Sequence, residues 1–165
     1  MGATRSGRIL VVEDESPLRG LIAQFLSVEG FDVVEASDGK EGVDFFSSRG
    51  PFDIVLLDLN LPMVPGVEVC RQIKLREPAQ RVIVCSAAVL DAHIAALTAL
   101  KVDQFLSKPY HPAELLNRIA LELDRAHHQP LERTGQFQSE VAWRLDPARQ
   151  GQETAHRLFK LPVID

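Results

Sequence analysis

The chain has 165 residues, which is the size of one domain with a remainder. An apolar content of 45% excludes disorder throughout. The 18 basic and 23 acidic residues give a net charge of −5, which argues against a protein whose main task is to bind nucleic acid. Residues 127–165 hold five residues of each sign, so the whole −5 belongs to residues 1–126.

Strand and helix signals alternate from residue 8 to residue 126. Short apolar runs predict five strands, over residues 8–12, 31–35, 53–57, 81–85 and 104–107. Apolar residues at helical spacing predict a helix after each strand, over residues 17–29, around 42–46, and over 67–75, 91–100 and 112–125. Ser16 is the expected N-cap of the first helix, with Pro17 at its first position. Five such β/α units predict an α/β fold with a parallel sheet covered by helices on both faces.

Polar side chains follow four of the predicted strands. They are two acids after the first strand, one acid after the third, a hydroxyl after the fourth and an ammonium after the fifth: Glu13, Asp14, Asp58, Ser86 and Lys108. Because the carboxyl ends of parallel strands meet at one edge of the sheet, we expect these side chains to lie together. Each residue type is ordinary at a strand end, but all five in this arrangement indicate a site.

The chemistry of these side chains predicts a metal and phosphoryl site. Three converging carboxylates repel one another unless a cation relieves them. Mg²⁺ prefers oxygen ligands and is held by one or two carboxylates together with phosphate. A lysine ammonium pairs with carboxylate or phosphate, and a carboxylate can itself be the nucleophile that forms an aspartyl-phosphate. The Pro65-Gly66 pair is expected to mark only a turn.

Four motifs resemble the receiver domain of two-component response regulators. They are Val-Val-Glu-Asp-Glu at 11–15, Asp-Leu-Asn-Leu-Pro-Met-Val-Pro-Gly at 58–66, Ser-Ala at 86–87 and Phe-Leu-Ser-Lys-Pro at 105–109. The resemblance covers residues 8–126 and implies a flavodoxin-like fold. That fold has a doubly wound, five-stranded parallel sheet in the order 2-1-3-4-5 and five helices. One departure is Lys101-Val102, where the family often has Gly-Ala.

The resemblance also implies a role for each site residue. Asp58 would accept a phosphoryl group from a sensor histidine kinase or a phosphotransfer protein. Mg²⁺ would be the cofactor, and its ligands would be Glu13, Asp14, Asp58 and the backbone carbonyl of Asn60. Lys108 would bridge Asp58 and the phosphoryl oxygens, and Ser86 would hydrogen-bond the phosphoryl group.

A switch is implied as well. Phe105 would rotate inward as Ser86 moves toward the phosphoryl oxygens. This movement would alter the surface formed by the fourth helix, fifth strand and fifth helix, which would bind a downstream protein or a second copy. The expected chemistry is self-phosphorylation and slow acyl-phosphate hydrolysis, not turnover of a substrate. A phosphatase of the haloacid-dehalogenase type would need a second aspartate where this chain has Asn60.

The ends of the chain are less informative. Residues 1–7 are expected to be an N-terminal tail and residues 127–165 a C-terminal extension of unknown role. The extension is interpreted as a tail packing on the receiver, a dimerisation arm, or the beginning of an output domain of a larger, for example DNA-binding, regulator. Its zero net charge offers no basic stripe for nucleic acid. The absence of a long apolar run, of a signal-peptide core and of a disulfide pattern predicts a cytoplasmic protein without membrane contact.

Overall fold

The computed structural model describes residues 7–87 and 91–128. The chain divides into two units, residues 1–129 and 130–165, and all described elements belong to the first. The residues of the C-terminal extension from position 129 onward therefore lie outside the described part, and so do the predictions made for them.

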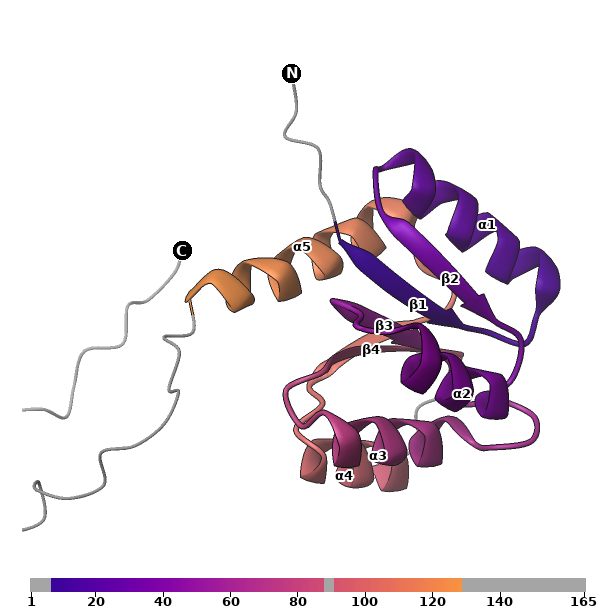
Figure 1. Ribbon diagram of the computed structural model, residues 1–165, viewed down its shortest axis with the longest axis vertical. Helices are drawn as coiled ribbons and strands as arrows, with labels where there is room; N and C mark the ends of the chain where they lie inside the picture. Colours follow the sequence, from indigo (N-terminus) through magenta and orange to yellow (C-terminus); the bar gives the residue numbers. More distant parts are fainter. Residues whose placement is uncertain (1–6, 88–90, 129–165) are drawn as a thin grey trace, which may run out of the picture. The chain divides into compact units, whose positions relative to one another are not determined.

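A parallel five-stranded sheet forms the centre of this unit (Figure 1). Its strands are β1 (Arg8–Val12), β2 (Asp32–Ala36), β3 (Ile54–Leu57), β4 (Arg81–Ser86) and β5 (Gln104–Ser107). Its helices are α1 (Ser16–Val28), α2 (Gly39–Arg49), α3 (Gly66–Arg76), α4 (Asp91–Ala99) and α5 (Pro112–His128). The strand order is β2-β1-β3-β4-β5, as predicted.

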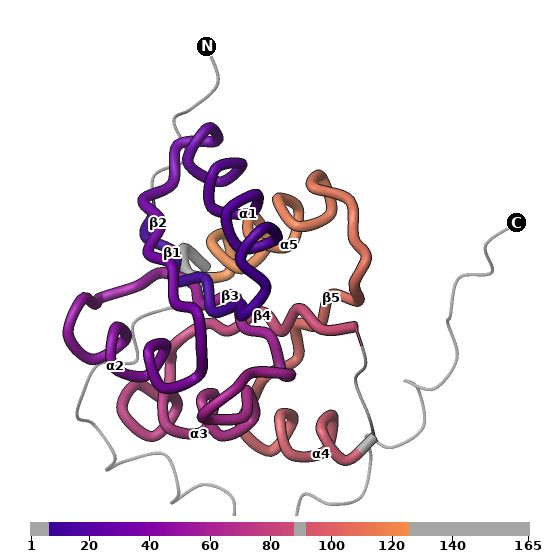
Figure 2. Tube along the Cα trace, turned by 90° about the vertical axis from the view of Figure 1, so that its right-hand side faces the viewer, coloured from indigo at the N-terminus to yellow at the C-terminus, as the bar shows by residue number. Residues whose placement is uncertain are grey.

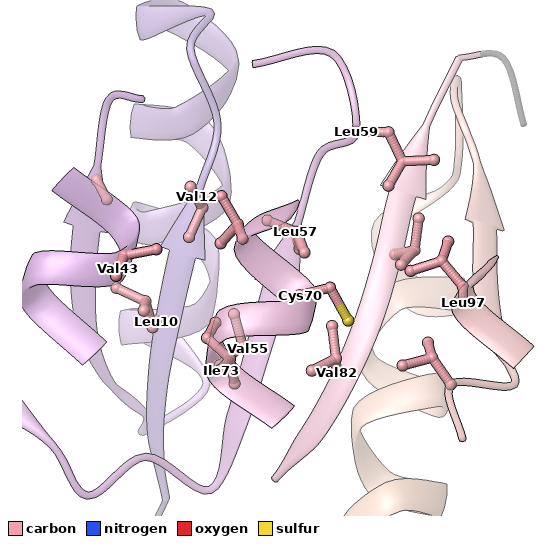
Figure 3. Close-up of a cluster of buried hydrophobic side chains, with 14 of the residues drawn as sticks. Leu10, Val12, Val43, Val55, Leu57, Leu59, Cys70, Ile73, Val82 and Leu97 are labelled. Carbon is pink, nitrogen blue, oxygen red and sulfur yellow. The ribbon is translucent and has the colours of Figure 1, made fainter. Parts of the chain in front are cut away.

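Helices cover the sheet on both sides. Figures 1 and 2 show α1 and α5 on one face and α2, α3 and α4 on the other. Each face has its own buried apolar cluster, because successive side chains of a strand point to opposite faces. In β1, Leu10 and Val12 face the cluster shown in Figure 3, whereas Ile9 and Val11 belong to the other cluster. A strand buried on both faces must be apolar at every position, and this explains the continuous runs in the sequence.

Several predicted boundaries move by one to three residues. Strand β2 begins at Asp32 and not at residue 31, because Asp32 is the partner of Arg8 in the ladder. The N-cap of α1 is Glu15 and not Ser16, since the carbonyl of Glu15 already accepts the helical hydrogen bond from the amide of Arg19 at 2.9 Å. Helix α5 continues to His128, three residues beyond the helix end predicted at position 125.

The turn after α4 forms although Lys101 stands where the resemblance favours glycine. Lys101 has a φ of 59°, in the left-handed region that favours glycine. The amide of the next residue, Val102, donates to the carbonyl of Leu97 at 2.9 Å, so the helix ends in a hydrogen-bonded turn despite the lysine. Among residues 7–87 and 91–128, no helix has both the length and the apolar character needed to cross a bilayer.

Candidate functional site

Three carboxylates meet at the carboxyl end of the sheet. Strand β1 pairs with β3 so that Val12 lies opposite Leu57, and the next residues along these strands are Glu13 and Asp58. One carboxylate oxygen from each of Glu13, Asp14 and Asp58 lies within 4.8 Å of the other two. Glu13 and Asp58 are buried, with 3% and 6% of their surface exposed, while Asp14 is exposed. The predicted convergence of these acids is therefore observed.

Lys108 neutralises part of this charge. Its Nζ donates to Glu13 Oε2 at 2.6 Å and to Asp58 Oδ2 at 2.5 Å, with 15% of the lysine side chain exposed. The backbone amide of Lys108 donates to the carbonyl of Ser86 at 3.1 Å, which ties the residue after β5 to the end of β4. Three carboxylates and one ammonium leave a formal charge of −2. A divalent cation would balance that charge.

Burial and the ion pairs act in opposite directions on the protonation of these groups. Burial raises the pKa of Glu13, and the nearby charge of Lys108 only partly opposes this effect. Burial alone would lower the pKa of Lys108, but its hydrogen bonds to Asp58 and Glu13 raise it above the ordinary value. The lysine is therefore charged at neutral pH. For Glu13, in contrast, burial makes ionisation costly, and a nearby cation would reduce that cost.

The loop after β3 fixes the orientation of Asp58. The amide of Asn60 donates to Asp58 Oδ1 at 3.0 Å, while Lys108 occupies Oδ2. At the start of α3, the amide of Gly66 donates to the carbonyl of Leu59 at 3.0 Å. A Cβ on Gly66 would lie 2.2 Å from the backbone oxygen of Asp58, closer than atoms can approach. Gly66 therefore does more than mark a turn, because it lets α3 pack directly against the backbone of Asp58.

The structure places Ser86 and Phe105 on neighbouring strands. Ser86 is the last residue of β4, is fully buried and pairs with Ser107 of β5. Phe105 lies opposite Val84 and is half-buried, and its side chain packs against the apolar cluster on the face of α2, α3 and α4. Ser86 thus lies at the same edge as the acids, whereas Phe105 lies beside the site and not in it.

One residue near the site was not predicted from the sequence. Arg19, in the first turns of α1, donates from Nη1 to the backbone carbonyl of Glu13 at 2.8 Å and to that of Asp14 at 3.4 Å. The sequence carries only a weak signal for this role, an arginine five residues after Asp14 on a helix interpreted mainly from its apolar face. The acceptors of the Arg19 hydrogen bonds are main-chain oxygens, which every residue possesses, so no residue type in the sequence marks them as its partners.

The donor set fits a hard divalent cation. Carboxylate oxygens on two strand ends, two of them buried, form the kind of cluster that binds Mg²⁺. The same edge carries a buried hydroxyl and a charged lysine, groups that hydrogen-bond and pair with phosphoryl oxygens.

Comparisons with known proteins agree with the observed fold. A family model described as the response regulator receiver domain matches residues 9–120. A CheY-like receiver domain protein from Methanospirillum hungatei has a similar structure, with a TM-score of 0.71 and 25% identity over 74% of this chain and 98% of that one. A receiver domain protein from Clostridium thermocellum has a TM-score of 0.67 and 30% identity, over 73% and 96% of the two chains. The BeF3-activated DrrB receiver domain has a TM-score of 0.64 and 29% identity, over 73% and 100%.

Proposed function

The chain belongs to the response regulator receiver domain family, and from this premise we propose that Asp58 accepts a phosphoryl group from the phosphohistidine of a sensor histidine kinase or of a phosphotransfer protein. The observation that carries the proposal is the place of Asp58, buried beside Glu13 and Asp14 with Lys108 on one carboxylate oxygen. In the transfer, a carboxylate oxygen of Asp58 forms a bond to phosphorus while the bond from phosphorus to the donor nitrogen breaks.

Mg²⁺ is the proposed cofactor. Glu13, Asp14 and Asp58 would hold it, together with the backbone carbonyl of Asn60. The ion supplies neutralisation of the charge on the phosphoryl oxygens. The formal charge of −2 that remains beside Lys108 supports a divalent ion at this position.

The residues of the chain then position the phosphoryl group. Lys108 is held by the carbonyl of Ser86 and already contacts Asp58, so its ammonium is placed to pair with the new oxygens. The Ser86 hydroxyl donates a hydrogen bond to the same group. The carboxylate of Asp58 becomes a mixed carboxylic–phosphoric anhydride that water hydrolyses slowly, so the protein turns over no substrate other than its own acyl phosphate.

The output of this chemistry is a change of binding surface. Phosphorylation adds about −1.5 to −2 charges and three acceptor oxygens, which attract Ser86 and open space for Phe105. The partner surface is that of α4, β5 and α5, because Phe105 lies on β5 between these helices. Its partner is a downstream protein or a second copy, and the C-terminal extension is a further candidate for this contact. We place the domain in the cytoplasm, where its two free, buried cysteines stay reduced.

The phosphorylation proposal is tested with acetyl phosphate and Mg²⁺. The wild type should gain the mass of one phosphoryl group, and hydroxylamine should remove it, as it does from acyl phosphates. Asp58→Asn should gain none. Asp44→Asn is the matched control, because Asp44 is an exposed carboxylate of α2 paired with Lys40. Full labelling of Asp58→Asn, or full labelling of the wild type in excess EDTA, would contradict the proposal.

A further inference from the structure

Arg19 connects the loop that carries two of the acids to the rest of the fold. Its Nη1 donates to the carbonyl oxygen of Glu13 at 2.8 Å and to that of Asp14 at 3.4 Å. Its Nε lies 3.6 Å from Glu35 Oε2 on the edge strand β2. The arginine side chain is largely buried, with 16% of its surface exposed. One guanidinium thus joins the turn after β1, helix α1 and strand β2.

Helix α1 offers little else at this end to hold the turn. Its N-cap, Glu15, makes no side-chain capping hydrogen bond, and the first turn contains no acidic residue. The amide of Glu15 approaches Glu13 Oε1 only at 3.4 Å, a long and weak contact. The 2.8 Å bond from Arg19 to the carbonyl of Glu13 is therefore the principal side-chain anchor of the main chain that carries Glu13 and Asp14, and the 3.4 Å contact to the carbonyl of Asp14 adds less.

We propose that Arg19 is a positioning residue for the metal site, holding the main chain of Glu13 and Asp14 so that their carboxylates are preorganised for the cation. This inference rests on the proposed function, since it deepens the role of the same acid cluster. Groups that orient metal ligands without touching the metal typically contribute 10–100-fold to metal affinity. Arg19 acts in this way through carbonyl oxygens rather than through the carboxylates.

Simple electrostatics predicts the opposite sign. A guanidinium near a cation site repels the incoming cation, so its removal would strengthen Mg²⁺ binding if charge were its main effect. If positioning dominates, its removal weakens binding even though a positive charge has been taken away. The direction of the change in Mg²⁺ affinity therefore separates the two effects.

The test measures Mg²⁺ binding to the full chain by isothermal titration calorimetry, with thermal melting of the metal-free protein as a check on folding. Arg19→Gln replaces the charged guanidinium with a shorter, neutral amide. Arg19→Lys keeps the charge but loses the planar guanidinium, whose Nη1 reaches both carbonyls while its Nε lies near Glu35. Glu35→Gln weakens the ion pair between Arg19 and strand β2 and leaves both Arg19 and the residues of the turn after β1 in place. Arg71→Gln is the control, because Arg71 is an exposed arginine of α3 paired with Glu68.

We expect Arg19→Gln to weaken Mg²⁺ binding about tenfold or more, Arg19→Lys and Glu35→Gln to weaken it less, and Arg71→Gln to leave it unchanged. Backbone amides of residues 13–15 should also exchange hydrogen faster in metal-free Arg19→Gln than in the wild type. Wild-type or tighter Mg²⁺ binding by folded Arg19→Gln would overturn the inference while leaving the proposed function intact. A wild-type protein that binds no Mg²⁺ would instead overturn the metal site itself.

Discussion

Lys108→Met tests whether the lysine is what allows two acids to be buried together. The substitution keeps an unbranched side chain but removes the ammonium that donates to Glu13 and Asp58. Both carboxyls remain almost fully buried, at 3% and 6% exposure. Breaking a buried ion pair by removing one partner costs about 3–5 kcal/mol, because the remaining charge is left uncompensated.

Protonation sets an upper limit on that cost. One pKa unit corresponds to about 1.36 kcal/mol, and the ordinary pKa of the Glu13 carboxyl is 4.5. Keeping one carboxyl protonated therefore costs about 4 kcal/mol at pH 7.5 but only about 2 kcal/mol at pH 6. The folded variant would hold a proton that the unfolded chain releases, so its stability must fall as the pH rises through this range.

The assay is urea unfolding of metal-free protein at pH 6 and pH 7.5, followed by circular dichroism. Lys108→Met should lose about 2 kcal/mol more than the wild type does between these pH values. Lys40→Met is the control, since Lys40 forms an exposed pair with Asp44 within α2, and it should change little at either pH. An equal loss of stability at pH 6 and pH 7.5 would refute the reasoning, because it would mean that neither buried carboxyl takes up a proton when the lysine ammonium is removed.

Three further predictions follow from the same contacts. Gly66→Ala should cost about 1–3 kcal/mol or more and slow phosphorylation, because its Cβ would collide with the backbone oxygen of Asp58; wild-type stability and labelling rate would contradict this. Since burial raises the pKa of Glu13, its ionised form destabilises the fold as the pH rises above 4.5. Metal-free Glu13→Gln should then be more stable than the wild type at pH 7.5, with the difference vanishing toward pH 4.5 in urea titrations. Burial raises the pKa of Cys70 to about 11 and that of Cys85 to about 12. A thiol reagent at pH 8 should therefore label both cysteines only as fast as the protein unfolds. Rapid labelling of the native protein would contradict this expectation.

The fold and the meeting of the acids could be predicted because each leaves a pattern in neighbouring residues. A strand buried on both faces shows as a continuous apolar run, as at residues 54–57. Once the strands are parallel, the residue after each run must lie at one edge of the sheet. The proximity of Glu13 and Asp58 can therefore be predicted from the positions and the parallel direction of their strands alone.

Other features could not be predicted because they depend on contacts with main-chain atoms, which no residue type in the sequence marks. The collision that excludes a side chain at Gly66 involves the carbonyl of Asp58, eight residues away. The sequence marks Gly66 as part of a turn and as the end of the motif at 58–66, but it does not reveal this contact. Arg19 bonds to main-chain oxygens, so no partner residue type reveals its role. The shift of the α1 N-cap from Ser16 to Glu15 belongs to the same class, since it is decided by which carbonyl accepts the first helical hydrogen bond.

The two cations near the acids make distinct contributions. Lys108 touches the carboxylates themselves and offsets part of their repulsion, so it competes with a metal for the same charge. Arg19 touches only the main chain beneath two of the acids and the edge strand beside them, so it constrains geometry without occupying ligand oxygens. A site that must accept both a cation and a phosphoryl group needs this division. If both cations bound the carboxylates directly, the formal charge of −2 would fall to −1 and the attraction for a divalent ion would weaken with it.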